Sequence, residues 1–179
     1  MQNLRWIVPA LILGLAAPGC VLVSGQFLLD FELEDFDVST STTVTREDVD
    51  LNEESVYEDH KEDLKGLADV AVLGMITNNS ATAIGVEVWM TAASTTYTTP
   101  GEVTTNATKL WGPFSVGVGE SKQVGWDESA ALFSSAGKTL LLNEIKGDGM
   151  FTIYAIADVG TYTFDVDNGV LALVLDAGK

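Results

Sequence analysis

The chain has little of the residue types on which most catalytic and metal sites depend. Its 179 residues include one cysteine, Cys20, and one histidine, His60. One cysteine excludes an intramolecular disulfide, and a zinc site needs three or four closely spaced Cys, His or carboxylate ligands. A charge-relay triad needs a base that accepts a proton near neutral pH. His60 lies between Asp59 and Lys61 in a charged segment, so we interpret it as a surface residue and predict no catalytic residue, no metal site and no enzyme activity.

Positive charge is also scarce. Nine lysine and arginine residues stand against 26 aspartates and glutamates, which gives a formal net charge of −17 at pH 7. All 26 acidic residues but only eight basic ones follow Cys20, so a chain cleaved there carries a net charge of −18. Such a chain is repelled by nucleic acid, which we do not expect as a partner. Because no glycine-rich phosphate loop is present, no cofactor is predicted either.

The amino-terminal segment has the layout of a signal peptide. One positive charge, Arg5, precedes an uncharged stretch over residues 6–17, which is shorter than the roughly 20 residues of a durable membrane span. The stretch ends in the sequence Leu15-Ala16-Ala17-Pro18-Gly19-Cys20. This sequence resembles the lipobox of bacterial lipoproteins, in which small residues precede a cysteine that is acylated and becomes the new amino terminus.

The resemblance implies export, acylation of Cys20 and anchoring of the chain in membrane lipid. Acylation also removes an unpaired thiol, which is a liability in an oxidising compartment. The residue after the cysteine is Val21, whereas lipoproteins retained in the inner membrane resemble one another in having aspartate there. We therefore expect the outer membrane as the location. The alternative is ordinary cleavage, for example after Ala17, which leaves Cys20 unmodified.

The rest of the chain has the length of one domain. We expect a signal peptide over residues 1–19, a lipidated tether over 20–26 and a single domain over 27–179. The domain begins with apolar residues at every second position, namely Phe27, Leu29, Phe31 and Leu33. This period of two predicts a strand with one apolar and one acidic face, as in an antiparallel sheet that is wet on one side.

Further short segments with strand character follow along the chain. They cover residues 67–77, 84–90, 104–111, 114–118, 150–157, 162–166 and 170–175. Turn residues predict a β-hairpin at Asn78-Asn79-Ser80 and another at Asp167-Asn168-Gly169. Residues 95–101 read as a polar loop or hairpin tip, and residues 139–146 as either helix or strand.

Two short helices are predicted between these strands. Ser55 and Glu58 fit a capping box that starts a helix running to about Lys65. Asp127 is the expected cap of a second helix that ends near Phe133. Strands at short spacing without long helices predict an all-β fold, an antiparallel β-sandwich of immunoglobulin-like or jelly-roll-like type with two short helices.

The sequence offers residues for two further kinds of site. Asp48, Asp50, Asn52 and Asp59 have part of the spacing of a calcium loop, but Glu53 occupies the position that needs glycine. A second oxygen-rich turn at residues 165–168 is explained by hairpin geometry. Four aromatic residues can either stack against sugar rings or pack in the core: Trp89, Tyr97, Trp111 and Trp126.

These observations favour a membrane-anchored, exported lipoprotein with a non-catalytic binding or structural role. Its predicted partner is membrane lipid, through the acylated Cys20, and a protein or glycan partner remains open. The alternative is a lipid-anchored hydrolase that acts on glycans through two of its many dispersed carboxylates.

Overall fold

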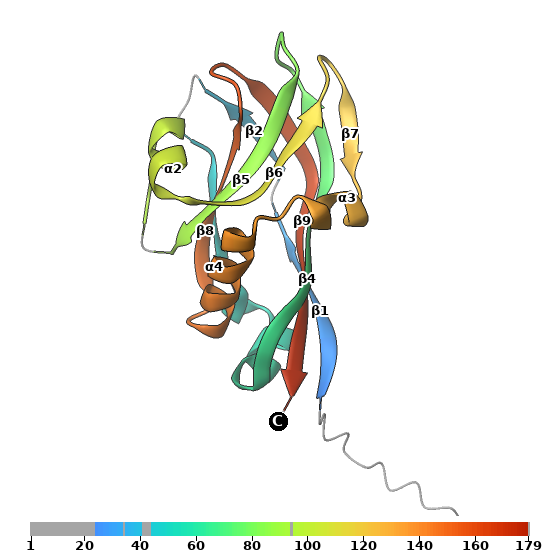
Figure 1. The fold of residues 1–179 in the computed structure, drawn as a ribbon, viewed down its shortest axis with the longest axis vertical. Coiled ribbons are helices and arrows are strands. Elements are labelled where there is room, and N and C mark those ends of the chain that lie inside the picture. The colour runs from blue at the N-terminus through green and yellow to red at the C-terminus, as the bar shows by residue number, and fades with distance from the viewer. Residues whose placement is uncertain (1–23, 34, 41–43, 94, 179) are drawn as a thin grey trace, which may run out of the picture.

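The computed structural model describes residues 24–33, 35–40, 44–93 and 95–178. The expected signal peptide, Cys20 and the first residues of the expected tether lie outside this part of the chain. The described chain forms two antiparallel sheets packed face to face (Figure 1), so the predicted all-β sandwich is confirmed. The larger sheet has the order β1 (Ser24–Glu32), β9 (Thr163–Gly178), β4 (Leu64–Asn78) and β7 (Ser121–Val124), with β2 (Phe36–Ser39) also paired with β9. The smaller sheet has the order β3 (Arg46–Asp50), β8 (Met150–Ala157), β5 (Ile84–Ala92) and β6 (Thr108–Val116).

The connections between strands define the type of sandwich. β1 and β2 pair with successive parts of β9 and act as one interrupted strand. β2 is followed by β3, β4 by β5, β6 by β7 and β8 by β9, and in each pair the two strands belong to different sheets. Eight strands connected in this way form the jelly-roll arrangement, one of the two types that the sequence left open.

The first predicted hairpin is therefore wrong. β4 and β5 follow one another through Asn78 and Asn79, but β4 pairs with β9 and β7, whereas β5 pairs with β6 and β8. The turn carries the chain from one sheet to the other. Asn78 is fully buried and its Nδ2 donates to the carbonyl oxygens of Thr82, Val116 and Gly117. Its side chain thus fastens this turn to the end of β6.

The second predicted hairpin is also wrong, because β9 runs without reversal from Thr163 to Gly178. Asn168 has a φ of 51° and lies where the register with β4 shifts, opposite Gly74, whose φ is 140°. The turn residues produce a β-bulge, which needs the same left-handed backbone conformation as a tight hairpin turn.

Four α-helices lie in the described part, two more than predicted. They are α1 (Ser55–His60), α2 (Pro100–Asn106), α3 (Trp126–Ala131) and α4 (Ser135–Lys146), with 3₁₀ turns at Leu51–Glu53 and Lys61–Asp63. α1 is shorter than predicted because the chain enters β4 at Leu64, whose side chain is buried. Lys65, where the predicted helix was expected to end, lies inside that strand.

The helix caps also differ from the predicted ones. The residue before α1 is Glu54, which makes no capping bond through its side chain, so the box predicted at Ser55 is not formed. α3 follows Gly125 rather than starting from an aspartate cap. A capping box is present at α2, where Thr99 and Glu102 bond each other's backbone N–H groups. α2 replaces the end of the loop predicted over 95–101 and the start of the strand predicted over 104–111, which begins at Thr108 instead.

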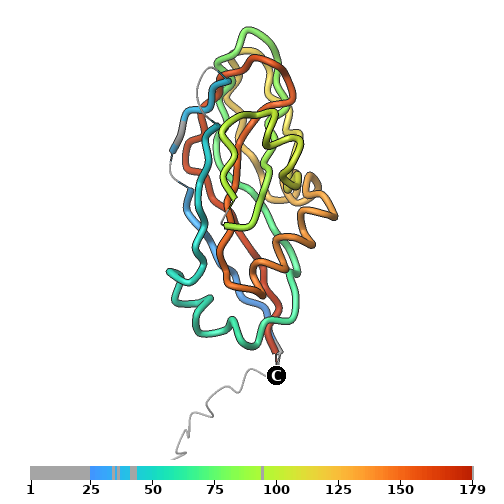
Figure 2. Tube along the Cα trace, turned by 90° about the vertical axis from the view of Figure 1, so that its left-hand side faces the viewer, coloured from blue at the N-terminus to red at the C-terminus, as the bar shows by residue number. Residues whose placement is uncertain are grey.

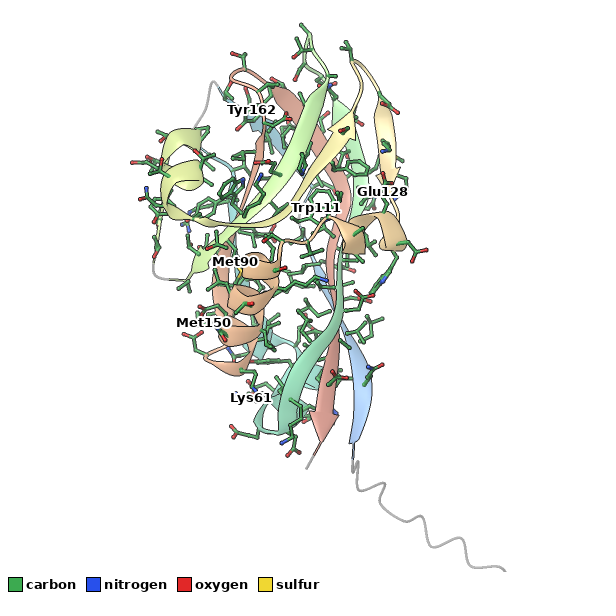
Figure 3. All side chains as sticks on the ribbon, viewed as in Figure 1. Lys61, Met90, Trp111, Glu128, Met150 and Tyr162 are labelled. Atoms are coloured by element: carbon green, nitrogen blue, oxygen red, sulfur yellow. The ribbon has the colours of Figure 1, made fainter. Side chains whose placement is uncertain are left out.

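α3 and α4 close one side of the sandwich, at the edges formed by β6 and β7. Figure 2 shows these helices, in orange, on one side of the strands, with β1 and β2, in blue, on the other. The helices cover Trp111, which is fully buried and labelled in Figure 3 beside them. The first turn of α4 comes so close to β6 that a Cβ atom at Gly137 would lie 2.6 Å from the Cα of Leu110.

Both ends of the described domain lie at the same pole of the sandwich. Ser24 in β1 is paired with Gly178 in β9. β1 thus begins three residues before residue 27, the predicted start of the domain. α1 and the start of β4 lie at this pole too, whereas the sheet-crossing turns lie at the opposite pole (Figure 1). The chain before Ser24 therefore enters the domain at the end farthest from those turns.

Candidate functional site

A cavity of about 540 Å³ opens on the side of the sandwich opposite α3 and α4. It lies between the interrupted edge strand of the larger sheet and β3 of the smaller one. Apolar side chains of Phe31, Ile153 and Ala155 form its floor. The polar residues around it are Glu32, Asp35, Thr45, Arg46, Glu47 and Asp48.

The bulge in β9 creates the opening. Where Asn168 and Gly169 interrupt the regular register, Leu33 N–H donates to the Gly169 carbonyl at 2.8 Å, and β1 has ended one residue earlier. The Asn168 N–H donates to Oδ1 of Asp35 at 2.6 Å, so the bulge also fixes this carboxylate. A hollow of about 300 Å³ adjoins the cavity and shares Glu32 and Asp35 with it.

The floor of the cavity is a part of the sandwich interior that reaches solvent. Ile153 and Ala155 lie on the face of β8 that is turned toward the larger sheet, and they are 6% and 9% exposed. Glu47 is paired with Ile153, so cross-strand neighbours place its half-buried side chain on this same inward face. Phe31 approaches from β1 and is also half-buried. A carboxylate thus stands directly beside an apolar surface.

Negative charge prevails around the cavity. Arg46, the one cation among the lining residues, donates from Nη1 to both carboxylate oxygens of Asp48, at 2.7 and 2.8 Å. Asp48 also accepts from the hydroxyl of Thr152 at 2.7 Å. The four lining carboxylates of Glu32, Asp35, Glu47 and Asp48 outnumber this one guanidinium, so the lining is negative.

The residues considered for calcium do not form a joint site. Oδ1 of Asp50 accepts from the backbone and side-chain amides of Asn52, at 3.0 and 2.7 Å. Oδ1 of Asn52 in turn accepts from Lys61 Nζ at 3.3 Å. Among all described residues, no group of three or more His, Cys, Asp or Glu side chains lies close enough to hold a metal ion.

The single histidine packs against the start of the sandwich. The rings of His60 and Phe27 lie 5.0 Å apart, centre to centre, where α1 meets β1. His60 is half-buried, so it is a surface residue whose ring is partly covered by β1.

The four aromatic candidates for sugar stacking do not form one group. Trp111 is fully buried and stacks on Phe114, so it is a core residue. Trp89 Nε1 donates to Glu87 on the outer face of the smaller sheet, and Trp126 Nε1 donates to Asp69 near α3. Tyr97 packs on Tyr154 with ring centres 5.9 Å apart. Trp89 is the cross-strand neighbour of Tyr154, so Trp89 and Tyr97 share the outer face of the smaller sheet, but Trp111 and Trp126 do not join them.

Of the residues that line the cavity, the sequence singled out Asp48 alone as a candidate ligand, and for calcium. Glu32, Asp35 and Glu47 belong to acidic, alternating segments, which the sequence indicates only as wet strand faces. One signal could have shown that Glu47 faces inward. Glu47 lies two residues before Val49 on the same short strand, so both side chains point to the same face, and Val49 is 1% exposed.

Comparisons with known proteins do not add a function to this geometry. No family model matches the chain, and no curated protein is significantly similar to it. Within the described residues, no helix combines the length and the apolar character needed to cross a membrane.

Proposed function

We propose that this chain is an exported bacterial lipoprotein that is anchored through an acylated Cys20 and binds a ligand in the cavity between its two sheets. Its role is binding rather than catalysis, and the outer membrane is the proposed location. The observation that carries the binding role is the cavity itself, which joins an apolar floor to a carboxylate rim. Ligand sites in proteins commonly combine a largely apolar lining with a few fixed polar groups and have volumes of about 300 to 1,000 Å³.

The position of β1 supports the anchor. Only three residues lie between Cys20 and Ser24, and the four residue steps from one to the other span at most about 14 Å when fully extended. An acylated Cys20 therefore holds the pole formed by β1, α1 and the end of β9 next to the bilayer. The cavity opens on the side of the sandwich, away from that pole, and stays accessible to a ligand in the surrounding solution. The negative net charge opposes flat contact of the domain with anionic headgroups.

The anchor is tested by expressing the full chain and its Cys20→Ser variant in a two-membrane bacterium, followed by membrane fractionation and mass spectrometry of the mature amino terminus. We expect the unaltered chain in the outer-membrane fraction, with an acylated Cys20 as its first residue. The Cys20→Ser chain is expected in the soluble fraction or as the unprocessed precursor. An unmodified, cleaved and soluble wild-type chain would refute the anchor.

A matched variant separates acylation from sorting. Val21→Asp leaves the cysteine intact and places aspartate where retained lipoproteins have it. We expect this variant to stay acylated but to move to the inner-membrane fraction. If it loses the acyl mass, the substitution has disturbed processing, and the resemblance of this segment to a lipobox does not extend to its recognition.

A further inference from the structure

We propose that the cavity takes a linear aliphatic polyamine, whose methylene groups lie on the apolar floor while its ammonium groups bind the rim carboxylates. This inference rests on the proposed binding function and names the class of ligand. Three features of the cavity carry it: its charge, the separation of its carboxylates and its apolar floor.

The charge selects a cation. Four carboxylates and one guanidinium line the cavity, which gives the lining a formal charge of −3. The guanidinium of Arg46 is already bound to both oxygens of Asp48, so it offers little to an anionic ligand. A concave site with low-dielectric walls concentrates the field of its carboxylates and raises the local concentration of cations.

The distribution of the carboxylates over the edges of both sheets favours an extended cation. The described residues contain no group of three or more acidic, histidine or cysteine side chains that converges on one metal position. Glu32 and Asp35 belong to the edge of the larger sheet, whereas Glu47 belongs to β3 of the smaller one. A ligand with several ammonium groups along one chain can reach carboxylates on both edges at once.

The floor selects an aliphatic chain between the charges. Phe31, Ile153 and Ala155 offer apolar surface beside the carboxylate of Glu47. Amphipathic chains such as the lysine side chain bury their methylene groups on surfaces of this kind and keep the ammonium group at a polar edge. Burial of each methylene group contributes favourably to binding, whereas an inorganic cation gains nothing from the floor.

The test is isothermal titration calorimetry of the full chain, purified in a non-ionic detergent at about 0.15 M salt, where diffuse surface attraction is largely screened. The probes are spermidine and 1,4-diaminobutane, with magnesium chloride as the cation that lacks an aliphatic chain. We expect one polyamine to bind per chain, spermidine to bind more tightly than the diamine, and magnesium not to displace it at equal concentration.

Two variants of equal charge locate the site. Glu32→Gln with Glu47→Gln removes two cavity carboxylates, and we expect it to weaken spermidine binding by about tenfold or more, because it removes charge-assisted hydrogen bonds from the bound ammonium groups. Asp59→Asn with Asp127→Asn removes two exposed carboxylates outside the cavity lining and should leave the affinity unchanged. Thermal melts establish that both variants are folded.

The outcomes separate this inference from the proposed function. Equal weakening by both double variants would mean diffuse attraction to an acidic surface and would overturn the polyamine site. Failure of either polyamine to bind the unaltered chain would also overturn it. Neither result affects the acylation of Cys20 or binding of another ligand class in the cavity, which are measured independently.

Discussion

The indole Nε1 of Trp111 lies 3.0 Å from both the hydroxyl and the carbonyl oxygen of Ser129, at the centre of the side closed by α3 and α4. The same hydroxyl accepts a hydrogen bond from the backbone N–H of Val72 at 2.8 Å. Both Trp111 and Ser129 are fully buried. The Ser129 side chain therefore joins β6 to β4 at Val72. This part of β4 has no pairing with β7, because the β4–β7 pairing begins only at Gly74.

Ser129→Ala is expected to destabilise the domain by about 1 to 3 kcal/mol. The substitution removes the acceptor of the Val72 N–H in a place that water does not reach, and an unsatisfied buried donor costs free energy of this order. Trp111 keeps the carbonyl of residue 129 as its acceptor, so the loss arises mainly at Val72. Chemical denaturation followed by tryptophan fluorescence measures the change.

Ser115→Ala is the matched control, because Ser115 lies exposed on β6. We expect this variant to change the free energy of unfolding by less than about 0.5 kcal/mol. Equal effects of the two substitutions would contradict the idea that Ser129 ties α3 to both sheets.

A second relationship concerns a buried charge on the outer face of the smaller sheet. Glu87 is 6% exposed, and its carboxylate binds Lys109 Nζ on the neighbouring strand and Trp89 Nε1 at 3.0 Å. Lys109→Met leaves the carboxylate with the indole alone. We expect a loss of about 2 to 3 kcal/mol, somewhat below the value for a fully buried pair, because the Lys109 side chain is 35% exposed.

The double variant Lys109→Met with Glu87→Gln should recover most of this loss, since a neutral amide oxygen still accepts from Trp89. Lys61→Met serves as the comparison, because Lys61 and Glu58 form a largely exposed pair that contributes at most about 1 kcal/mol. Urea unfolding of the four chains yields these values. If Lys109→Met costs no more than Lys61→Met, water reaches Glu87 and its burial is not maintained.

Local patterns in the sequence predicted most of the strands, though not β7, and did not predict which strands pair. The alternation around Leu29 gave β1 its correct inward face, because side-chain parity is a local property of a strand. Asn168 was assigned to a hairpin because a positive φ is common to that turn and to a bulge. Which of the two forms depends on the pairing of β9 with β1 and β4, and those strands lie far away in the sequence.

The cavity could not be predicted from local sequence patterns either, because it also depends on which strands pair. Phe31, Glu47 and Ile153 come from three strands that are widely separated along the chain, and no short-range spacing links them. Each acidic residue on the rim follows the pattern of an ordinary solvated strand face. Only the bulge at Asn168, which ends β1, turns these positions into one concave site.

The same bulge region contains two acidic side chains placed directly opposite one another. Asp37 on β2 is paired with Asp165 on β9. A hydrogen bond between the two carboxyl groups raises the pKa of Asp37 above its usual 3.8, and the negative charges of Asp165 and Asp167 raise it further. A raised pKa means that the folded state holds this proton more tightly than the unfolded state does, so the stabilisation is complete below pH 3.8 and disappears as the pH rises through the folded-state pKa.

Asp37→Asn is therefore expected to raise the melting temperature at pH 7, where the wild-type chain carries like charges on adjacent strands. At pH 3, below even the usual pKa of Asp37, that side chain is mostly protonated, and the advantage of the variant should vanish. Asp30→Asn is the matched control, because Asp30 on β1 faces Ala172 across the strand pair and its removal relieves no such repulsion. Thermal melts of the three chains between pH 3 and pH 7 provide the measurement. A melting temperature that rises equally at both ends of this range would show that Asp37→Asn acts through packing, because repulsion between carboxylates requires them to be ionised.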